Sequence, residues 1–502
     1  MKVCLISINA KSFSLPPYGV WVLKAYLDKY SPEKDLQIDT EILSFSSDTP
    51  MKTIEDAIAN VNPDLVGLSH YIWNDSQTIN LLKRLHKVIK ADTKVIIGGP
   101  HADRTDERLI AYLERGLLDA IVIGEGEKPL FHIVESVSKG EEIAPIDGIV
   151  CREEKGLNSY KPQVHLLKQD INFLPNPYQT SDELLASSIT SGSIQYETSR
   201  GCPFSCTFCD QGHKAYRSLT MERIKLDLSF FAAYKPKHID FLDGTFNLSP
   251  KRTIELLNYL IEINQSTGCT FHAEIKPELL TSEEIKLMKK ANFSSVELGL
   301  QSIHTSTLKA IKRRNVWEKL EKTVGNLLDE GIDVILNTII GLPGETLQLW
   351  YESLDYCFNL GRVKILSNVL KILPNTVMSQ QVEEFGFEYR RENFNAIEST
   401  NALSKEDLHK AIVINKLVNM FWNQVNNPIS IQLLTHHIYK DKFHKLLEDI
   451  SNLLLAEPKL LQVKHFHVEV LNRILDNSSL EEEKNFQIKA QIQKDFIQEV
   501  AV

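Results

Sequence analysis

The sequence of 502 residues lacks the features that mark membrane, fibrous and nucleic-acid-binding proteins. No apolar run approaches the roughly 18 residues of a membrane-crossing helix, and the N-terminus has no long apolar stretch followed by a cleavage site. Basic residues are not in excess, since 56 Lys and Arg face 66 Asp and Glu for a net charge of −10. This balance argues against broad electrostatic binding to nucleic acid or to an anionic membrane, so neither is expected as a partner.

Cysteine is also scarce, and its count is odd. Seven cysteines in a long chain exclude a disulfide scaffold and indicate a reducing compartment, which here means the cytoplasm. Repeats and low-complexity tracts are absent, and 43% hydrophobic and 24% charged residues are typical of a soluble globular protein. The length predicts about three domains.

Residues 1–145 alternate short apolar runs with stretches of helical periodicity. Strands are expected at 3–8, 64–69, 94–97 and 120–123, with helices at 18–30, at 79–91 and from residue 128. This alternation predicts an α/β domain, flavodoxin-like or Rossmann-like, with a parallel sheet that binds ligands beyond the carboxyl ends of its strands.

A second series of strands and helices follows a Pro- and Ser-rich linker (146–192) that contains a hairpin at 148–152. Residues 193–378 hold six expected strands, at 194–198, 238–242, 270–274, 295–298, 333–337 and 367–370. They predict a partial (β/α)6 barrel, whose chemistry lies at the strand C-termini. Residues 379–502 are expected to form a helical C-terminal domain that covers the barrel mouth.

Three cysteines lie close together in the loop after the first strand of this barrel. Cys202, Cys206 and Cys209 have the spacing C-x3-C-x2-C. Such a loop can wrap three thiolates around one iron–sulfur cluster, and because a closed cluster needs four cysteines, one iron would stay open. A structural zinc site without a local fourth ligand, or chance clustering, are the alternatives.

This loop, with Phe208 before its last cysteine, resembles the radical S-adenosylmethionine (SAM) superfamily. The resemblance covers about residues 197–374. It implies a [4Fe–4S] cluster on Cys202, Cys206 and Cys209, SAM on the open iron, a 5′-deoxyadenosyl radical, and an external electron donor of the flavodoxin or ferredoxin type. It assigns SAM contacts to Phe208, Asp243, Thr245, Glu274, Gln301 and Arg314. Taken alone, each of these outlying polar residues also suits a structural hydrogen bond.

The first domain resembles the cobalamin-binding domain of the cobalamin-dependent radical SAM class. The resemblance assigns cobalamin contacts to Ser69, His70, Tyr71, Trp73, Gly98, Gly99, Gly124, Glu125 and Gly126. Glycines at 98 and 99 are expected to make room for the nucleotide tail of the cofactor. The D-x-H-x-x-G element that supplies a cobalt ligand is missing, so His70 is either a cobalt ligand or a hydrogen-bonded histidine at a strand end. A flavodoxin-like domain without cobalamin is the alternative.

Together the two resemblances imply a methyltransferase that moves a methyl group from methylcobalamin to an unactivated carbon or phosphorus after hydrogen abstraction. The substrate is expected to be a small molecule or a peptide. One alternative is non-methylating radical chemistry, such as peptide epimerisation, ring contraction or cyclisation, with Cys269 or Cys357 as candidate hydrogen-atom donors in epimerisation. The other is a non-catalytic cobalamin carrier or sensor.

Overall fold

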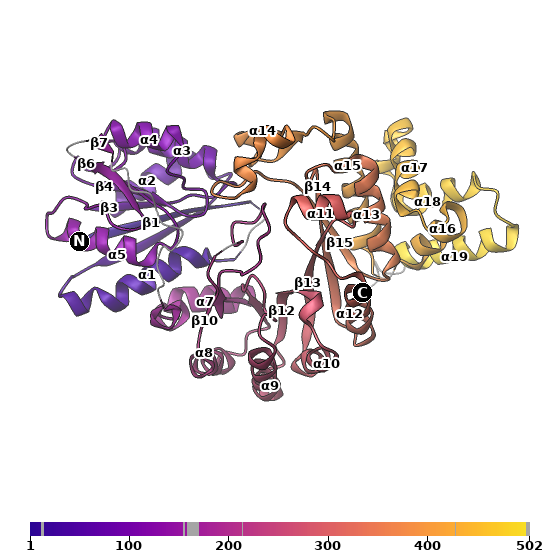
Figure 1. Cartoon of the computed structure of the whole chain (residues 1–502), viewed down its shortest axis with the longest axis horizontal. Coiled ribbons are helices and arrows are strands. Elements are labelled where there is room, and N and C mark those ends of the chain that lie inside the picture. The colour runs from indigo at the N-terminus through magenta and orange to yellow at the C-terminus, as the bar shows by residue number, and fades with distance from the viewer. Residues whose placement is uncertain (12–14, 154–155, 158–169, 213, 427, 498–502) are drawn as a thin grey trace.

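A computed structural model describes residues 1–11, 15–153, 156–157, 170–212, 214–426 and 428–497. An N-terminal sheet domain, a central barrel and a helical domain follow one another along the long axis of the molecule (Figure 1). Within the described ranges, no helix is long and apolar enough to cross a membrane.

The N-terminal domain is built on a seven-stranded sheet in the order β2-β1-β3-β4-β5-β6-β7. Its strands are β1 Lys2–Asn9, β2 Asp39–Ser46, β3 Leu65–Ser69, β4 Lys94–Gly98, β5 Ala120–Val122, β6 Ile149–Glu153 and β7 Gly156–Leu157. The first five are parallel, whereas β6 and β7 add antiparallel pairs. The predicted α/β fold is therefore confirmed, and the hairpin within the predicted linker extends the first sheet.

Helices cover both faces of this sheet. They are α1 Tyr18–Tyr30, α2 Met51–Val61, α3 Asp75–Leu85, α4 Glu107–Glu114 and α5 Glu127–Ser138. Accordingly β1 is apolar on both faces, with Cys4 and Ile6 in one core cluster and Val3 and Leu5 in the other. The edge strand β2 is half-exposed and is not among the predicted strands, and α3 begins earlier than predicted because its first turn is polar.

The barrel is a six-stranded parallel sheet in the order β15-β14-β13-β12-β11-β8, which confirms the predicted six strands. Its strands are β8 Ser193–Tyr196, β11 His238–Phe241, β12 Thr270–Ile275, β13 Phe293–Gln301, β14 Asp333–Ile340 and β15 Lys364–Val369. Its helices are α8 Met221–Ala233, α9 Pro250–Thr267, α10 Ser282–Ala291, α11 Thr305–Ala310, α12 Trp317–Asp329 and α13 Leu347–Asn359. Two short helices, α6 Pro177–Thr180 and α7 Asp182–Ser191, lead into β8.

The C-terminal domain closes the free edge of the barrel. Its helices are α15 Lys405–Val418, α16 Ile429–Tyr439, α17 Phe443–Ala456, α18 Phe466–Asp476 and α19 Glu482–Ile497. Asn423 exchanges two hydrogen bonds, of 2.9 and 2.8 Å, with the backbone of Ile365, so its amide covers polar groups of the edge strand β15. The helices α15 and α17 pack on β15 and α13, at the side of the barrel.

A small element between barrel and helices reaches the C-terminal ends of the barrel strands instead. It consists of α14 Val382–Phe385 and a hairpin of β16 Glu388–Tyr389 and β17 Ile397–Ser399, which the sequence analysis did not predict. Ile397 packs so closely on Gly341, after β14, that a Cβ at Gly341 would lie 2.2 Å from its side chain.

Candidate active site

The cysteine loop, residues 201–216, is closed at its base by a two-stranded ribbon at the C-terminal end of β8. The ribbon pairs β9 Ser199–Arg200 with β10 Arg217–Ser218. Gly201 has φ +80°, and a Cβ there would lie 2.4 Å from the carbonyl oxygen of Ala215. Only glycine therefore allows the two arms of the loop to approach this closely.

The three cysteines of the loop are free thiols and lie close together in the sequence. Cys202 is buried, while Cys206 and Cys209 are half-buried. The amide of Cys209 donates to the carbonyl of Cys206 at 3.3 Å, and the amide of Gly212 donates to that of Cys209 at 3.3 Å. This tight turn keeps all three thiols on one short loop.

The three sulfur atoms are not drawn together at one point. Among the described residues, only His70, Asp75 and His101 bring three potential ligand atoms within 4.8 Å of one another, so the three sulfurs are more widely spread. Zn–S bonds of about 2.3 Å would hold thiolates about 3.8 Å apart. The three sulfurs are therefore not already gathered at the spacing of a zinc site.

Positive charge lies against the loop. The Arg313 guanidinium donates to the Sγ of Cys206 at 3.7 Å and to the carbonyl of Gly299. Lys276 lies 5.3 Å from the ring centre of Phe204, and burial together with Arg313 lowers its pKa. The predicted Arg314 is exposed, so its neighbour Arg313 is the arginine that reaches the cysteines.

Asp243 and Thr245 are predicted SAM contacts. In the structure, Asp243 binds the ribbon at the base of the cysteine loop, and Thr245 lies beside a cysteine of the loop. The buried Asp243 carboxylate accepts hydrogen bonds from the amide and hydroxyl of Thr198, at 3.1 and 2.7 Å, and from the Ser199 hydroxyl. Burial raises the pKa of Asp243, although Arg252 opposes the shift. The Thr245 hydroxyl lies 3.6 Å from the Sγ of Cys202.

The remaining SAM candidates differ in their exposure and in their hydrogen-bond partners. Part of the Glu274 side chain is exposed. The pKa of its carboxyl is raised to about 7, first because the surrounding protein partly removes it from water and then because Glu297 and Asp240 are negatively charged. Gln301 is 8% exposed at φ +69°, and its Oε1 has no hydrogen-bond partner among the described residues. A buried acceptor without a partner fits a site whose ligand supplies the donor. Phe208 is half-buried against the main core cluster.

At the facing edge of the N-terminal domain, Gly98 and Gly99 have an internal role. The His70 amide donates to the Gly98 carbonyl at 2.7 Å, and a Cβ on Gly99, where φ is +115°, would lie 2.7 Å from the His70 carbonyl oxygen. The backbone of the loop after β3 thus by itself requires a glycine at this position, while contact of Gly98 and Gly99 with the nucleotide tail stays a prediction.

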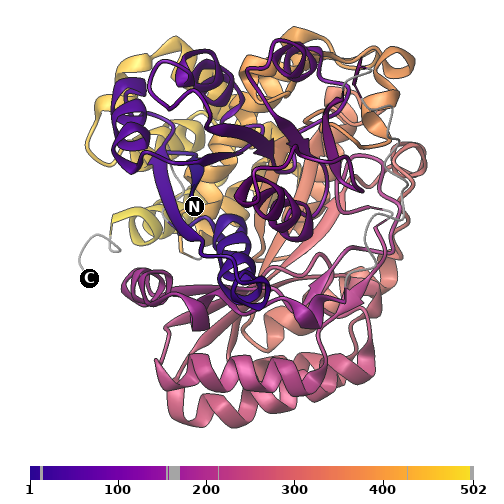
Figure 2. The same ribbon diagram turned by 90° about the vertical axis from the view of Figure 1, so that its left-hand side faces the viewer.

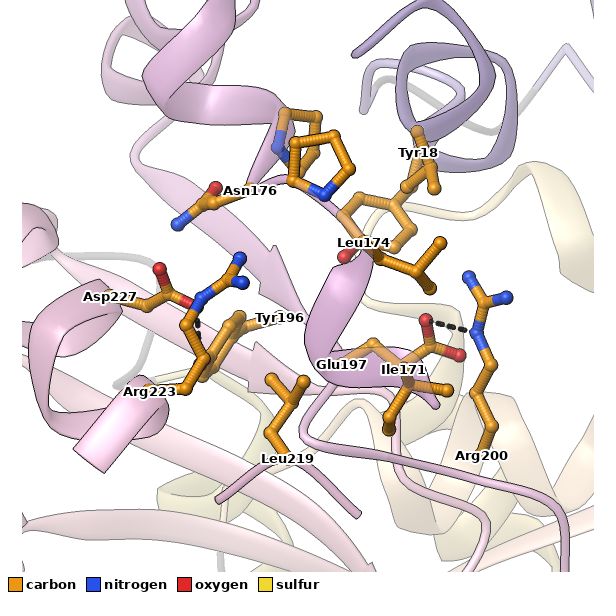
Figure 3. A pocket seen from close by; sticks show the side chains of 13 residues that line it. Tyr18, Ile171, Leu174, Asn176, Tyr196, Glu197, Arg200, Leu219, Arg223 and Asp227 are labelled. Carbon is orange, nitrogen blue, oxygen red and sulfur yellow. Dashed lines mark hydrogen bonds and ion pairs between the residues drawn. The ribbon is translucent and has the colours of Figure 1, made fainter. Parts of the chain in front are cut away.

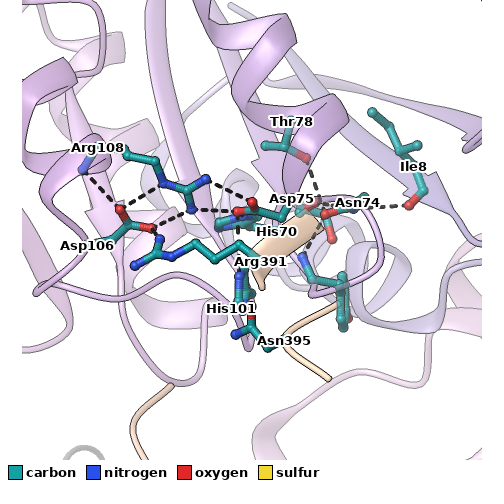
Figure 4. A network of polar contacts seen from close by, with 12 residues as sticks. Ile8, His70, Asn74, Asp75, Thr78, His101, Asp106, Arg108, Arg391 and Asn395 are labelled. Atoms are coloured by element: carbon teal, nitrogen blue, oxygen red, sulfur yellow. Dashed lines mark hydrogen bonds and ion pairs between the residues drawn. The ribbon is translucent and has the colours of Figure 1, made fainter. Parts of the chain in front are cut away.

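His70 itself belongs to a buried polar network, shown in Figure 4. Its Nε2 lies 2.9 Å from an Asp75 carboxylate oxygen, and Arg108 donates two hydrogen bonds, of 2.8 and 2.7 Å, to the same carboxylate. The His101 Nε2 lies 3.5 Å from it. His70 is therefore hydrogen-bonded within the protein through Nε2, as one of the two alternatives predicts. Its Nδ1 has no partner among the described residues.

Other predicted cobalamin contacts lie in two loops of the same edge. Ser69 ends β3, and the Tyr71 and Trp73 rings after it stack 4.2 Å apart. Burial raises the pKa of Tyr71, and the negative charge of Asp210, in the cysteine loop, adds to this effect. In the loop 124–126, Glu125 is bound by arginines of the barrel, as described below, and Gly124 has open space around its Cα.

The two candidate hydrogen-atom donors lie away from this region. Cys357 is completely buried in α13, outside the barrel sheet, and burial raises its pKa to about 12. Cys269 is buried before the first residue of β12, at the strand end opposite to the cysteine loop.

Comparison with known proteins agrees with this geometry. The model of the radical SAM superfamily matches residues 196–357, and that of the B12 binding domain matches residues 8–134. An uncharacterized methyltransferase of Pyrococcus horikoshii is 29% identical over 66% of this chain and 70% of its own length. The cobalamin-dependent radical SAM methyltransferase TokK of Streptomyces tokunonensis is 26% identical over 67% of this chain, which spans about half, 51%, of TokK.

The cobalamin-dependent SAM radical enzyme OxsB, solved with aqua-cobalamin and SAM bound, has the same fold. It superposes with a TM-score of 0.68 at 18% identity, over 98% of this chain and 78% of OxsB.

The chain therefore joins a B12-binding domain to a radical SAM domain, which makes it a radical SAM enzyme by its domains. It is homologous to the cobalamin-dependent radical SAM methyltransferases. These domains imply a [4Fe–4S] cluster, SAM and cobalamin as its cofactors.

Proposed function

We propose that the protein transfers a methyl group from methylcobalamin to an unactivated carbon or phosphorus of a small molecule. One observation carries the proposal: Glu125, in the loop after β5 of the B12-binding domain, binds Arg217 at the base of the cysteine loop of the barrel. A cobalamin at this edge of the B12-binding domain and a cluster in the cysteine loop would then face one common space.

When bound, the cluster and SAM supply a hydrogen-abstracting radical, and cobalamin supplies the methyl group. The chain holds these groups in place. Cys202, Cys206 and Cys209 would bind the cluster, and Arg313 would donate an N–H to its Cys206 sulfur. Glu274 and Gln301 would accept hydrogen bonds from SAM, since one is open to solvent and the other has a free buried oxygen.

The placement of the other cysteines favours methyl transfer over epimerisation. A thiol that quenches a substrate radical must lie near the cluster, whereas Cys269 lies at the opposite strand end and Cys357 lies outside the barrel. The cysteine loop also argues against a cobalamin carrier or sensor, which needs no open-iron cluster. The electron for SAM cleavage would come from an external donor of the flavodoxin or ferredoxin type.

The test uses anaerobically reconstituted holoenzyme with a low-potential reductant. We expect SAM-dependent formation of 5′-deoxyadenosine and of methylcobalamin from added cob(I)alamin, and a gain of one methyl group in any accepted substrate. Deuterium uptake from solvent into a product of unchanged connectivity, with no added methyl group, would instead establish epimerisation. Formation of neither nucleoside nor methylcobalamin would refute the proposal.

A further inference from the structure

The ribbon that closes the cysteine loop carries an arginine on each strand, and both reach glutamates of the N-terminal domain. Arg217 binds the Glu125 carboxylate with both terminal nitrogens, one of them at 3.1 Å. Arg200 lies 2.7 Å from Glu127 and 3.6 Å from Glu125. Glu125 lies between β5 and α5, and Glu127 is the first residue of α5, so the four residues, here called the ribbon clamp, join the two domains.

Arg200 and Arg217 are direct cross-strand partners in the ribbon. Like charges in this arrangement repel each other and destabilise a strand pair. Glu125 contacts both guanidinium groups and offsets that repulsion. The ribbon at the base of the cysteine loop therefore depends on a carboxylate from the other domain.

The clamp is largely withdrawn from water. The side chain of Glu127 is 4% exposed and that of Arg200 is 14% exposed, while Arg217 and Glu125 are 22% and 26% exposed. Charges buried this deeply must be paired, so losing one partner is costly. Arg200 also donates to Glu197 at 2.8 Å, which ties it to the end of β8.

Figure 3 shows the packing beside the clamp. Glu197 and Arg200 line a cavity of about 30 Å³ together with Tyr18 of α1 and Leu174 of the linker. Such a cavity holds about one water molecule, so the domains fit closely here. A closely packed, ion-paired contact restricts the relative movement of two domains more than a solvated one.

We propose that the ribbon clamp fixes the distance between the cobalamin-bearing edge and the cluster-bearing loop. Glu125, Glu127, Arg200 and Arg217 are then positioning residues for methyl transfer, a consequence that rests on the proposed function. Radical chemistry tolerates little misplacement, since an error of about 1 Å can cost about a hundredfold in rate.

The chain offers a matched control in a second interdomain ion pair. Arg391, in the segment that connects β16 to β17, binds Asp106 of the N-terminal domain at 2.7 Å, as Figure 4 shows. Its side chain is 45% exposed and does not belong to the ribbon. Arg391→Met therefore removes an interdomain arginine without touching the clamp.

The first measurement needs no cobalamin. Hydrogen exchange of the cluster-loaded full chain is compared for wild type, Arg217→Met, Glu125→Ala, their double variant and Arg391→Met. We expect amides of 120–127 and 199–218 to exchange about tenfold faster in each clamp variant, with no further increase in the double variant. Arg391→Met should leave both segments unchanged. Wild-type exchange in both clamp single variants overturns the clamp.

The second measurement reads the cofactor separation directly. Hydroxocobalamin is loaded and reduced to cob(II)alamin, and the acceleration of its spin relaxation by the reduced cluster is recorded by EPR. We expect a loss of this acceleration in Arg217→Met at unchanged iron and cobalamin content, and wild-type relaxation in Arg391→Met. Wild-type relaxation in both clamp variants would refute the positioning role. If wild type binds no cobalamin, the proposed function fails, while hydrogen exchange still decides the clamp.

Discussion

The two edges that face each other in this protein are built in opposite ways. At the barrel edge, Cys206 is half-buried, Glu274 is exposed, and the side-chain oxygen of Gln301 has no hydrogen-bond partner among the described residues. These groups can therefore still bind a ligand. At the N-terminal edge, His70 and Glu125 are already bound by the protein itself.

This difference indicates two ways of holding a ligand. The barrel edge offers chemical groups that a cluster and SAM need as ligands and acceptors. The N-terminal edge offers a rigid shape, in which the polar network around Asp75 holds the loop after β3 in one conformation. Variants at the first edge should therefore change cofactor chemistry, whereas variants at the second should change stability before they change binding.

The largest effect is expected from Cys206→Ala. Losing one of three thiolate ligands should abolish cluster binding and 5′-deoxyadenosine formation, since the open-iron cluster has no spare cysteine. Iron content and nucleoside yield are the measurements. Cys269→Ala, which removes a buried cysteine away from the loop, should keep both. Full nucleoside yield from Cys206→Ala would contradict the role of the loop.

At the other edge, Asp75→Asn should destabilise the protein by about 2–4 kcal/mol. Burial alone would raise the pKa of Asp75, but hydrogen bonds from His101, His70 and Arg108 hold it well below its usual range. Its contribution to stability is thus present at neutral pH and is lost only as strong acid protonates the carboxylate. Urea denaturation at pH 7 measures the loss, with the exposed Asp92→Asn as control. An unchanged midpoint would show that the network is dispensable.

Gly99→Ala tests whether the glycine serves the chain or a ligand. The added Cβ meets the His70 backbone at 2.7 Å and forces a residue with a side chain to φ +115°, so we expect a loss of about 1–3 kcal/mol. Gly124→Ala is the control, because φ is +84° there but no atom lies within 4 Å of the new Cβ. It should cost about 1 kcal/mol. Wild-type stability of Gly99→Ala with lost cobalamin binding would return the glycine to its predicted ligand role.

Arg313→Met should lower the reduction potential of the cluster by on the order of tens of mV. The variant loses a positive charge and an N–H that donates to the Cys206 sulfur, and both stabilise the reduced cluster. A redox titration followed by EPR measures the shift. Arg314→Met, which changes the exposed neighbour, should leave the potential unchanged. Equal shifts in the two variants would show that only overall charge matters.

The smallest effect concerns pH. With a pKa of about 7, Glu274 is largely protonated at pH 6 and ionised at pH 8, and only the carboxylate accepts two ligand hydroxyls. We therefore expect SAM to bind a few-fold more tightly at pH 8 than at pH 6, and Glu274→Gln to remove this dependence. Isothermal titration at both pH values is the measurement. A wild-type slope in Glu274→Gln would assign the titration to another group.

Prediction from sequence worked where one local pattern decides the outcome. Apolar periodicity located α1 and the six barrel strands, and cysteine spacing located the cluster loop. Prediction from sequence was less informative where a contact depends on the direction in which a side chain points. Arg313 and Arg314 are adjacent in sequence, and only the fold turns the first of them toward Cys206.

Long-range pairings were beyond the sequence for the same reason. The motif 124–126 predicted a ligand loop, yet nothing local shows that Glu125 lies between Arg200 and Arg217, about 75–90 residues further on. Likewise the spacing of Gly99 from Ser69 suggested a cofactor contact, but it did not show that the His70 backbone lies where a Cβ on Gly99 would point.

The central claim is that one chain holds an open-iron cluster and a cobalamin at facing edges. Anaerobic purification and reconstitution, followed by iron, sulfide, zinc and cobalamin quantification, tests it most directly. The account predicts about four irons, about four sulfides and about one cobalamin per chain, with no zinc. One zinc and no sulfide per chain, or a full cluster with no bound cobalamin, would contradict it.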